Sequence, residues 1–553
     1  MPSGVGLFLI GFLVLFLELA CIRWFAANVI FLQFFTNVVL LASFLGLSCG
    51  CLAARQRHNW LARTPALMFV TFLAAILMLW AFHDWSGVGI DVHQQRPQEV
   101  FFGTEGMNSD VAQFVVPIEF VAGVFFVLIA LLFVGLGQAL GRAFDAYPER
   151  VRGYSLNIAG SLAGIVAFAI VSFAQTPPLV WFLIACGGIA YVMRDRGDLT
   201  FGRAALLGLV VVAAVTPTVL SDPGFQWWWS PYYAIRYRPS DRTIAVNTIG
   251  HQVIVPFDSG GAFYSAVHLL QRHSGGKPFR DVLVIGAGNG NDVAHALRFG
   301  AERVDAVEID PAIQKIGVDE HPDRPYEDPR TVRWLDDGQH HLRTTDRTYD
   351  LVVYALVDSL ILHSTYANIR LESFLFTDPA FADVRRVLKP VGVFIMYNYF
   401  RQGWIVRRAG SMAEKAFGTR PIAIRLPYAD HLESNEPVEF VTLIAGNNLS
   451  IADAFRRHGT FWLNAEPPRN LAANGFDVRP ETMSAHEART WMRIPPAVFT
   501  PDAGTPIRTS DDWPFLYVRD RVIPAADAAF DGGVRSPWAC DGVRVPAEAA
   551  RPD

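Results

Sequence analysis

The sequence predicts a multi-pass α-helical membrane bundle followed by a soluble α/β domain with a doubly wound, mostly parallel sheet, and a small β unit between them. Two observations carry this prediction. The chain is 52% hydrophobic and 18% charged, and its hydrophobic excess lies in the first 220 residues, which is too apolar for an ordinary soluble protein. The half after Ser221 alternates apolar strands with helix signals, a pattern typical of a parallel sheet.

Changes in composition along the chain set the expected domain boundaries. Most charged residues lie beyond the apolar part, and a stretch rich in Ala, Pro, Asp and Gly ends the chain. We therefore expect a transmembrane domain at 1–222, a β-rich unit and membrane-interface segment at 223–279, an α/β domain at 280–524 and a flexible tail at 525–553.

Seven apolar runs approach the length that crosses a bilayer. They are residues 5–29, 35–54, 64–82, 114–140, 154–174, 178–193 and 204–220. The first run lacks a basic leader and a small-residue cleavage site, so we expect it to be retained. The last run is short and contains Pro217, so it is either a seventh crossing or a re-entrant or interfacial helix. Six crossings are favoured.

Arginines in the short loops predict the orientation. They follow the second, fourth and sixth runs, as Arg55, Arg57, Arg63, Arg142, Arg150, Arg152, Arg194, Arg196 and Arg203. Such loops face the cytoplasm. Six crossings place the soluble domain in the cytoplasm as well, whereas a seventh crossing would place it on the other side.

Small residues and polar groups occur inside the apolar runs. Glycines four apart, at 46 and 50, 137 and 141, and 160 and 164, predict close approach of helix backbones. Glu18, Arg23 and Glu119 are ionisable groups in or beside the runs, and either a pairing of an acid with Arg23 or a polar pathway explains them.

A glycine-rich turn predicts a nucleotide cofactor. Residues 281–290 read DVLVIGAGNG, an apolar strand that runs into Gly286, Gly288 and Gly290, where missing side chains let a ligand approach a helix N-terminus. Glu308 ends the next strand, at the usual position for an acid that holds ribose hydroxyls. The spacing G-x-G-x-G favours S-adenosylmethionine or its decarboxylated form over a dinucleotide.

Other cofactor-binding candidates follow from the same sheet edge, since ligands bind at the carboxyl ends of parallel strands. They are Asn289 in the turn, Asp310 after the second strand and Asp337 after the third. Asp337 is expected either to accept a hydrogen bond from the adenine amino group or to cap the following helix.

The loop after the fourth strand holds the catalytic candidates. It is apolar apart from Asp358, which is placed to act as a base, with His363 and Tyr366 as assistants. A lone histidine such as His363 is more often a packed or surface residue.

Composition excludes other classes of site and partner. The five cysteines show neither zinc spacing nor a disulfide framework, and no metal site is expected. A net charge of −5 without a basic block gives no footprint for nucleic acid. The expected partners are the lipid bilayer and a small-molecule or amphipathic acceptor, and the sequence leaves a homo-oligomer open.

Residues 232–399 resemble the spermidine synthase-like branch of the class I S-adenosylmethionine-binding proteins. The apolar half resembles the helical domain fused to many bacterial members, with signatures at 154–164 and 509–517. The resemblance implies a class I methyltransferase-like fold and a bacterial-type inner membrane. It also implies that residues 286–290 form the cofactor loop, that Glu308 binds the ribose and that Asp337 faces the adenine.

The chain departs from this family at its acceptor loop. Aminopropyltransferases carry Asp-x-x-Asp-Pro after the fourth strand, and the matching positions here are Ala355, Asp358 and Ser359. Asn289 also replaces an Asp between the glycines. The sequence alone therefore ranks alkyl transfer, chiefly methyl transfer, before aminopropyl transfer. A non-catalytic transporter or sensor that binds a nucleoside or polyamine is the third reading.

Overall fold

The computed structural model describes residues 3–29, 32, 36–84, 88–91, 114–357 and 371–446, with short gaps at 221–222, 248, 260–261, 401–402, 427–430 and 433–439, and only short pieces beyond residue 446. The described residues up to Gln252 form one compact unit, and those from Val253 onward form the other.

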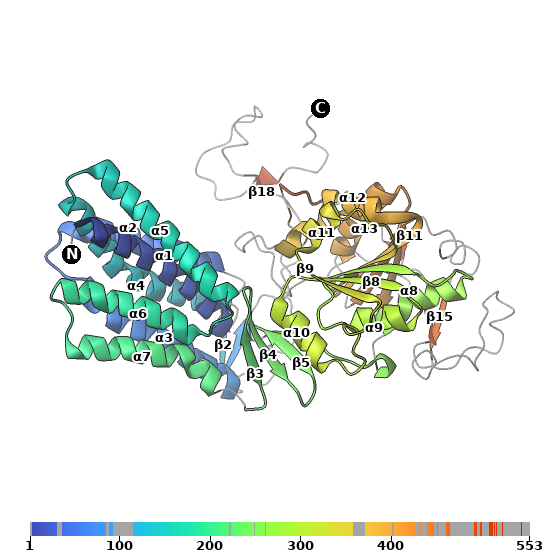
Figure 1. Cartoon of the computed structure of the whole chain (residues 1–553), viewed down its shortest axis with the longest axis horizontal. Helices are drawn as coiled ribbons and strands as arrows, with labels where there is room; N and C mark the ends of the chain where they lie inside the picture. The colour runs from blue at the N-terminus through green and yellow to red at the C-terminus, as the bar shows by residue number, and fades with distance from the viewer. Residues whose placement is uncertain are drawn as a thin grey trace. The chain divides into compact units, whose positions relative to one another are not determined.

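The first unit contains seven long helices (Figure 1). They are α1 (Ser3–Asn28), α2 (Thr36–Leu52), α3 (Thr64–Asp84), α4 (Ile118–Ala146), α5 (Arg150–Phe173), α6 (Pro178–Asp195) and α7 (Phe201–Val219). All seven are long and apolar enough to cross a membrane. Two short parallel strands, β1 (Val88–Asp91) and β2 (Phe114–Pro117), precede α4, so the fourth helix begins a few residues later than the apolar run predicts.

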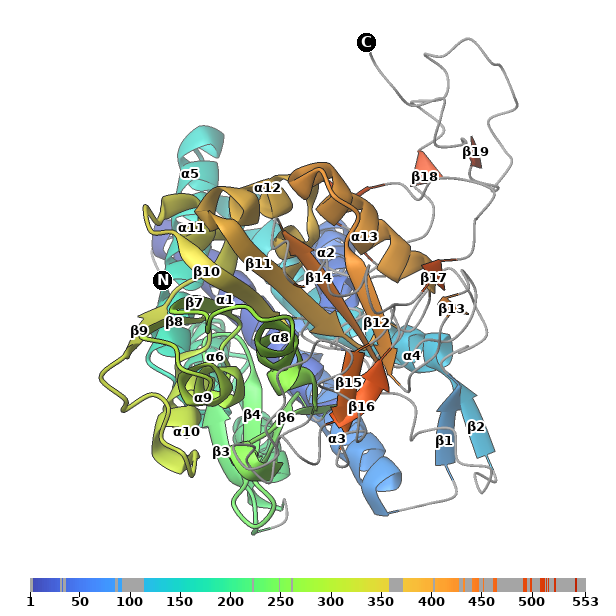
Figure 2. The same cartoon turned by 90° about the vertical axis from the view of Figure 1, so that its right-hand side faces the viewer.

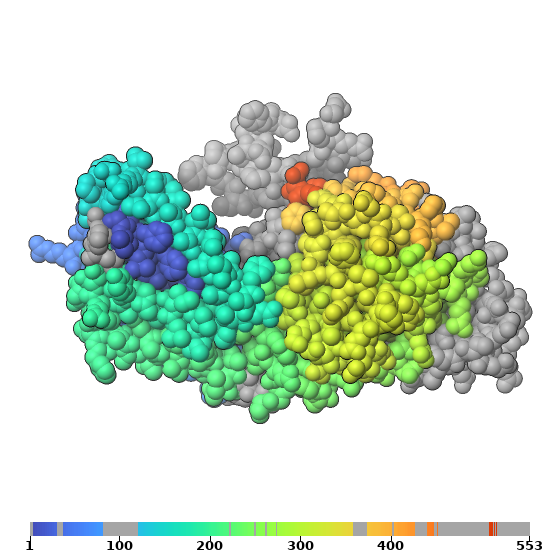
Figure 3. Space-filling model, in the orientation of Figure 1, coloured from blue at the N-terminus to red at the C-terminus, as the bar shows by residue number. Residues whose placement is uncertain are grey.

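The predicted small-residue pairs lie where helix backbones meet. A Cβ added at Gly160 would lie 2.0 Å from the carbonyl oxygen of Phe8, and one at Gly46 would lie 2.1 Å from that of Ala130. Figure 3 shows the N-terminal part of α1 in contact with α5. Only glycine permits this approach, which replaces the hydrophobic driving force that is missing in lipid.

Polar side chains in the bundle behave in two ways. The Gln138 amide is fully buried and bonds to the backbone of Ala53, His58 and Trp60 at 2.7–2.9 Å, which ties α4 to the turns after α2. Glu18 is 1% exposed, and neither of its oxygens has a hydrogen-bond partner. No hydrogen bond from Arg23 to Glu18 is therefore found between these two described residues, and the choice between a pairing and a polar pathway stays a prediction.

Arginine side chains mark one end of the bundle. Arg142 Nε donates to the carbonyl of Ala54 at 2.9 Å, and Arg196 donates to that of Ala139 at 3.2 Å, which brings together the ends of α2, α4 and α6. The loop that leads into α7 joins them, because Asn59 donates to Asp198 at 2.8 Å. We call this the arginine end.

The opposite end of the bundle carries the exit of the chain. Arg23, near the end of α1, donates to the carbonyl of Ser230, and its guanidinium carbon lies 4.8 Å from the ring centre of Trp181 at the start of α6. The Trp24 indole donates to the carbonyl of Ala214 in α7 at 2.8 Å. Helix α7 thus runs from the arginine end to the opposite end, so its geometry does not support a re-entrant or interfacial helix.

A four-stranded antiparallel sheet follows α7 in this unit. Its strands pair in chain order and are β3 (Gln226–Trp229), β4 (Ala234–Arg238), β5 (Thr243–Val246) and β6 (Ile249–Val253). Three consecutive tryptophans lie in β3, within the segment expected at the membrane interface, and the ring centre of Trp229 lies 5.1 Å from that of Trp181. The predicted small β unit is confirmed.

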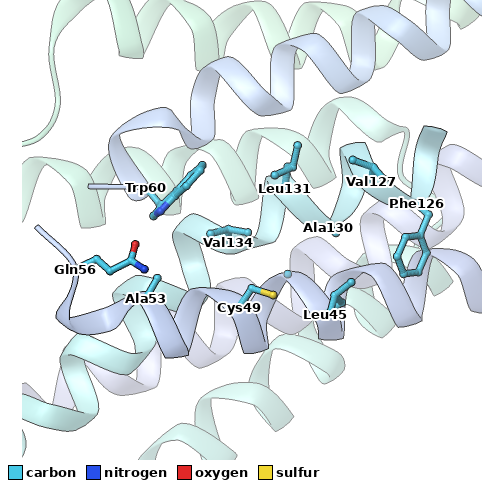
Figure 4. Close-up of a pocket in the computed structure, with 11 residues that line it drawn as sticks. Leu45, Cys49, Ala53, Gln56, Trp60, Phe126, Val127, Ala130, Leu131 and Val134 are labelled. Atoms are coloured by element: carbon cyan, nitrogen blue, oxygen red, sulfur yellow. The ribbon is translucent and has the colours of Figure 1, made fainter. Parts of the chain in front are cut away.

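A pocket of about 400 Å³ lies between α2 and α4 (Figure 4). Side chains of Leu45 and Cys49 from one helix and Phe126 and Leu131 from the other line it, with Trp60 at its end. None of the eleven lining residues carries a carboxylate or an imidazole. This pocket is therefore not the acid-bearing site that the sequence predicts.

The second unit is built on a seven-stranded sheet of order β12-β14-β11-β10-β7-β8-β9. Five neighbouring strands are parallel, namely β11 (Leu388–Asn398), β10 (Tyr349–Ala355), β7 (Asp281–Ile285), β8 (Arg303–Glu308) and β9 (Thr331–Leu335). The antiparallel strands β14 (Phe440–Gly446) and β12 (Ile422–Leu426) complete one edge. The predicted doubly wound, mostly parallel sheet is confirmed.

Helices cover both faces of this sheet (Figure 1, Figure 2). On one face lie α8 (Ala262–His273), α9 (Asn291–Arg298) and α10 (Pro311–Glu320), and on the other lie α11 (Gly338–Thr344), α12 (Asp378–Val387) and α13 (Gly403–Phe417). Strands β7 and β10 and the later half of β11 are mostly apolar because both of their faces are buried.

Candidate functional site

The order of the strands places the candidate site at the carboxyl end of β7. The chain proceeds from β7 to β8 and β9 on one side, and β10 and β11 lie on the other side. Such a reversal opens a crevice outside the strand ends, where doubly wound sheets bind their ligands. The glycine turn, residues 286–290, fills this position.

Backbone conformation explains the glycines of the turn. Gly286, Gly288 and Gly290 have φ angles of 70°, 55° and 99°, a region that side chains rarely adopt. A Cβ at Gly286 would lie 2.6 Å from Cγ1 of Val357. The turn leads directly into α9, whose free N–H groups favour an anionic or polar ligand atom.

Glu308 holds the turn from the end of β8. Its side chain is 6% exposed and accepts hydrogen bonds from the N–H of Gly288 and the N–H of Asp310, both at 2.8 Å. Burial raises the pKa of Glu308 to about 7, although these backbone donors oppose the shift. A carboxylate has further lone pairs, so Glu308 retains the capacity to accept from ribose hydroxyls.

Asp310 and Asp337 both cap helices. Asp310 Oδ1 accepts from the N–H of Ala312 at 2.8 Å and from that of Ile313 at 3.2 Å, at the start of α10. Asp337 Oδ1 accepts from the N–H of His340 at 2.8 Å, at the start of α11. Capping is therefore one function of Asp337, and its second oxygen lies at the carboxyl end of the sheet beside β9, where an adenine contact stays a prediction.

Asn291 stands where the dinucleotide motif G-x-G-x-x-G would have its last glycine, and the contacts of its side chain explain why a glycine would not serve here. Its amide nitrogen donates to the carbonyl of Val253 at 2.9 Å and to the Tyr264 hydroxyl at 3.0 Å, and its oxygen accepts from the N–H of Val255 at 3.2 Å. Asn291 thus fastens the segment before α8 to the glycine turn. The neighbouring Asn289 is 3% exposed and its oxygen accepts from the N–H of Asn291 at 3.2 Å, so it shapes the turn.

Tyr326 packs against the glycine turn and bonds to its backbone. Its hydroxyl donates to the carbonyl of Gly288 at 2.7 Å, and its ring lies 3.1 Å from the position of a Cβ on Gly290. No sequence pattern points to Tyr326, because it lies in a loop far along the chain from the turn.

An acid and several aromatic rings lie beside the glycine turn. None of them is among the site residues predicted from the sequence. Asp292, in the first turn of α9, accepts a hydrogen bond from the Tyr397 hydroxyl at the end of β11. The Tyr397 ring centre lies 6.3 Å from that of Tyr264 and 5.4 Å from that of Phe263. An acid directly after a glycine turn is the one signal that could have singled out Asp292.

The three catalytic candidates Asp358, His363 and Tyr366 lie outside the described residues, so their roles stay predictions. The described part of this loop consists of Leu356 and Val357. Leu356 has a φ of 49°, an unusual conformation for a branched side chain, and such strained backbone clusters at functional sites.

Asp511 belongs to a structural contact. Its carboxylate accepts from Arg343 of α11 and from the Thr377 hydroxyl, both at 2.8 Å, and Thr509 nearby is fully buried. The signature that contains these residues therefore fixes a C-terminal segment to α11 and α12. Among the described residues, no group of three or more His, Cys, Asp or Glu is arranged to hold a metal ion.

Comparison with known proteins identifies the second unit. The family model of the spermine/spermidine synthase domain matches residues 269–416. The polyamine aminopropyltransferase of Escherichia fergusonii is 28% identical over 123 residues, which cover 22% of this chain and 40% of that protein. That of Alkaliphilus oremlandii is 37% identical over 82 residues, covering 14% of this chain and 29% of that protein.

The likeness to solved structures is weak and covers only part of the chain. The spermidine synthase of Thermotoga maritima is 16% identical, with a TM-score of 0.30, and the similarity covers 39% of this chain and 69% of that one. The chain spans about two fifths of the length of the first curated relatives. Residues 269–416 thus form a spermidine synthase-like domain, and it follows seven helices that are long and apolar enough to be membrane spans.

Proposed function

We propose that this chain is a membrane-bound aminopropyltransferase. It takes an aminopropyl group from decarboxylated S-adenosylmethionine, the donor, and passes this group to an amine. The observation that carries the proposal is the glycine turn held by Glu308, which lies at the switch point of the sheet and inside the stretch that matches the family. The acceptor, the lipid bilayer as a partner and the oligomeric state belong to the proposal.

The residues of the turn fit this donor. Glycines with positive φ let its nucleoside approach the backbone, and the buried Glu308 supplies a carboxylate for its ribose hydroxyls. The donor supplies an alkyl carbon that is already activated by a positive sulfur. When they are ionised, Glu308, Asp310 and Asp292 place negative charge around the turn, which suits a sulfonium cation. Positioning then supplies most of the catalysis.

Methyl transfer from S-adenosylmethionine, which the sequence alone ranks first, is supported by none of the comparisons. The family model and the curated relatives favour aminopropyl transfer instead. A non-catalytic transporter or sensor has in its favour only polar side chains of the bundle such as Glu18. We therefore place aminopropyl transfer first.

Calorimetry on the detergent-purified full chain tests the proposal. We expect decarboxylated S-adenosylmethionine to bind more tightly than S-adenosylmethionine or S-adenosylhomocysteine, and Glu308→Gln to weaken this binding about tenfold or more, as for a lost charge-assisted hydrogen bond. Glu302→Gln is the matched control, because Glu302 lies at the exposed surface, paired with Arg280. Preference for S-adenosylmethionine would favour methyl transfer, and no binding by any of the three would favour the transporter or sensor.

Turnover is measured on the same preparation. With putrescine or a longer primary amine as the acceptor, we expect release of the neutral thioether nucleoside, which keeps its methyl group on sulfur when the aminopropyl group leaves. Binding of the donor without any turnover of amines would contradict the proposed activity.

A further inference from the structure

The end of strand β10 lacks a carboxylate in its described part. Its last residue is Ala355, followed by Leu356 and Val357. An amine acceptor is a cation in water and needs an acid near the reacting carbon, both to hold it and to take its proton. Among the described residues, the acid nearest to this position comes from another element.

The register of the sheet shows which element this is. Ala355 of β10 pairs with Tyr397 of the parallel strand β11, so the two residues are direct neighbours across about 5 Å. The Tyr397 hydroxyl donates to Oδ1 of Asp292. Asp292 thus reaches, from the first turn of α9, the region in front of the carboxyl end of β10.

Aromatic rings pack around the tyrosine that bonds to this acid. We call Phe263, Tyr264, Tyr397 and Phe440 the aromatic wall. Within it, the ring centre of Phe263 lies 4.2 Å from that of Tyr264 and 4.7 Å from that of Phe440, and Tyr397 lies 5.8 Å from Phe440. Faces of aromatic rings attract ammonium groups, especially beside a carboxylate in a site with little water.

The environment of Asp292 suits a base. Burial raises the pKa of Asp292 to about 7, and the hydrogen bond from Tyr397 opposes that shift. A carboxyl group that ionises near neutral pH both binds a cation and accepts a proton efficiently at the pH of the cell. Asp292 also follows the cofactor turn by only two residues, since Gly290 ends that turn.

We propose that Asp292 and the aromatic wall form the acceptor site and that Asp292 acts there as the base from the first turn of α9. This inference rests on the proposed function and names the residues that hold and deprotonate its amine acceptor. The Asp292 carboxylate takes one proton from the ammonium. The neutral nitrogen then bonds to the carbon beside sulfur as the carbon–sulfur bond breaks, and its electron pair stays on sulfur as a neutral thioether. The protonated Asp292 releases its proton to water.

Substitution of the acid tests this assignment. In the full chain, Asp292→Asn is expected to lower kcat/KM for the amine at least a hundredfold, while the Kd for decarboxylated S-adenosylmethionine changes less than about threefold. Asp281→Asn is the matched control, because Asp281 begins β7 at the other end of the strand and pairs with Lys389. This control should keep kcat/KM within about threefold of the unsubstituted chain.

A relocated acid makes the test specific. We expect the double variant Asp292→Asn with Ala355→Asp to regain at least tenfold of the lost kcat/KM, because the register places residue 355 beside Tyr397. A purely structural role for Asp292 would not permit this rescue.

Two results would overturn the assignment while leaving the proposed function intact. One is an Asp292→Asn variant that turns over the amine as fast as the unsubstituted chain. The other is a parallel loss of donor binding and turnover in that variant without rescue, which would make Asp292 part of the fold. An unsubstituted chain that binds the donor and turns over no amine would instead refute the proposed function, and the acceptor site with it.

Discussion

At the scale of the residue, Asp292 and Tyr397 make a prediction about pH. Asp292 must be ionised to accept a proton, so the rate should fall as the pH drops below its pKa of about 7. The Tyr397 hydroxyl donates to the ionised form and thereby lowers this pKa. Tyr397→Phe should therefore move the acidic limb of the pH profile of kcat/KM upward, by about half to one pH unit.

The control for this shift is a tyrosine outside the site. Tyr349→Phe removes a hydroxyl that bonds to Asp305, at the opposite end of β10, and should leave the acidic limb in place. An acidic limb that does not move in Tyr397→Phe would show that another group accepts the proton.

Glu308 makes a prediction about stability. Its pKa is raised from 4.5 to about 7 in the folded chain, so the folded state holds a proton that the unfolded state has already released between these pH values. Its contribution to stability is complete below pH 4.5 and is lost as the pH rises through 7, by about 1–3 kcal/mol. Glu308→Gln, which does not ionise, should lose less of the melting temperature between pH 5 and pH 8 than the unsubstituted chain does.

Thermal unfolding without ligand measures this difference. Only the change of melting temperature with pH is compared between the two chains, because glutamine at 308 has one acceptor oxygen fewer for the backbone N–H groups of Gly288 and Asp310. Equal pH dependence in the two chains would mean that Glu308 is ionised at pH 5 in the folded state.

At the scale of the element, glycines decide how closely the helices of the bundle pack. Gly160→Ala should lower the stability of the bundle by about 3 kcal/mol or more, because its Cβ would meet the Phe8 carbonyl at 2.0 Å. Gly187→Ala in α6 is the control, since nothing lies within 4 Å of its Cβ, and a gain of helix propensity is expected there. Thermal unfolding in detergent should separate the two variants, and equal melting temperatures would contradict the close approach of α1 and α5.

Element by element, local patterns predicted what depends on local physics. The apolar strand predicted before Gly286 is observed as Asp281–Ile285, and Glu308 ends the next strand, Arg303–Glu308, as predicted, because hydrophobic patterns act over a few neighbours. The glycine turn and Glu308 were recognisable for the same reason. Asp292, Tyr397 and Tyr326 were not, since their contacts depend on strand order and register, which join residues about 40 to 100 positions apart.

At the scale of the whole molecule, the two ends of the bundle predict sidedness. The arginine end carries the residues that face the cytoplasm in most membrane proteins, and α7 runs from it to the end where the β3–β6 sheet lies. Among the described residues, no helix after α7 is long and apolar enough to cross back. The cytoplasmic placement of the soluble domain, which depends on six crossings, thus stays a prediction that this arrangement weakens.

Labelling of single cysteines from outside the cell tests sidedness. In a chain without its native cysteines, a cysteine at the exposed Asp241, in the turn between β4 and β5, should react with a membrane-impermeant maleimide in intact cells. A cysteine at the exposed Arg57 should react only after the membrane is opened. Reaction of both positions under the same condition would show that α7 does not cross.

The run of α7 from the arginine end to the opposite end also bears on metabolic supply. A sulfonium nucleoside carries a permanent charge and does not diffuse through hydrocarbon. If the arginines face the cytoplasm, the donor must be exported or collected from the surroundings before it reaches the α/β domain, so transport of the donor would limit flux. On the proposed function, the amine product would then be released on that same side without an export step.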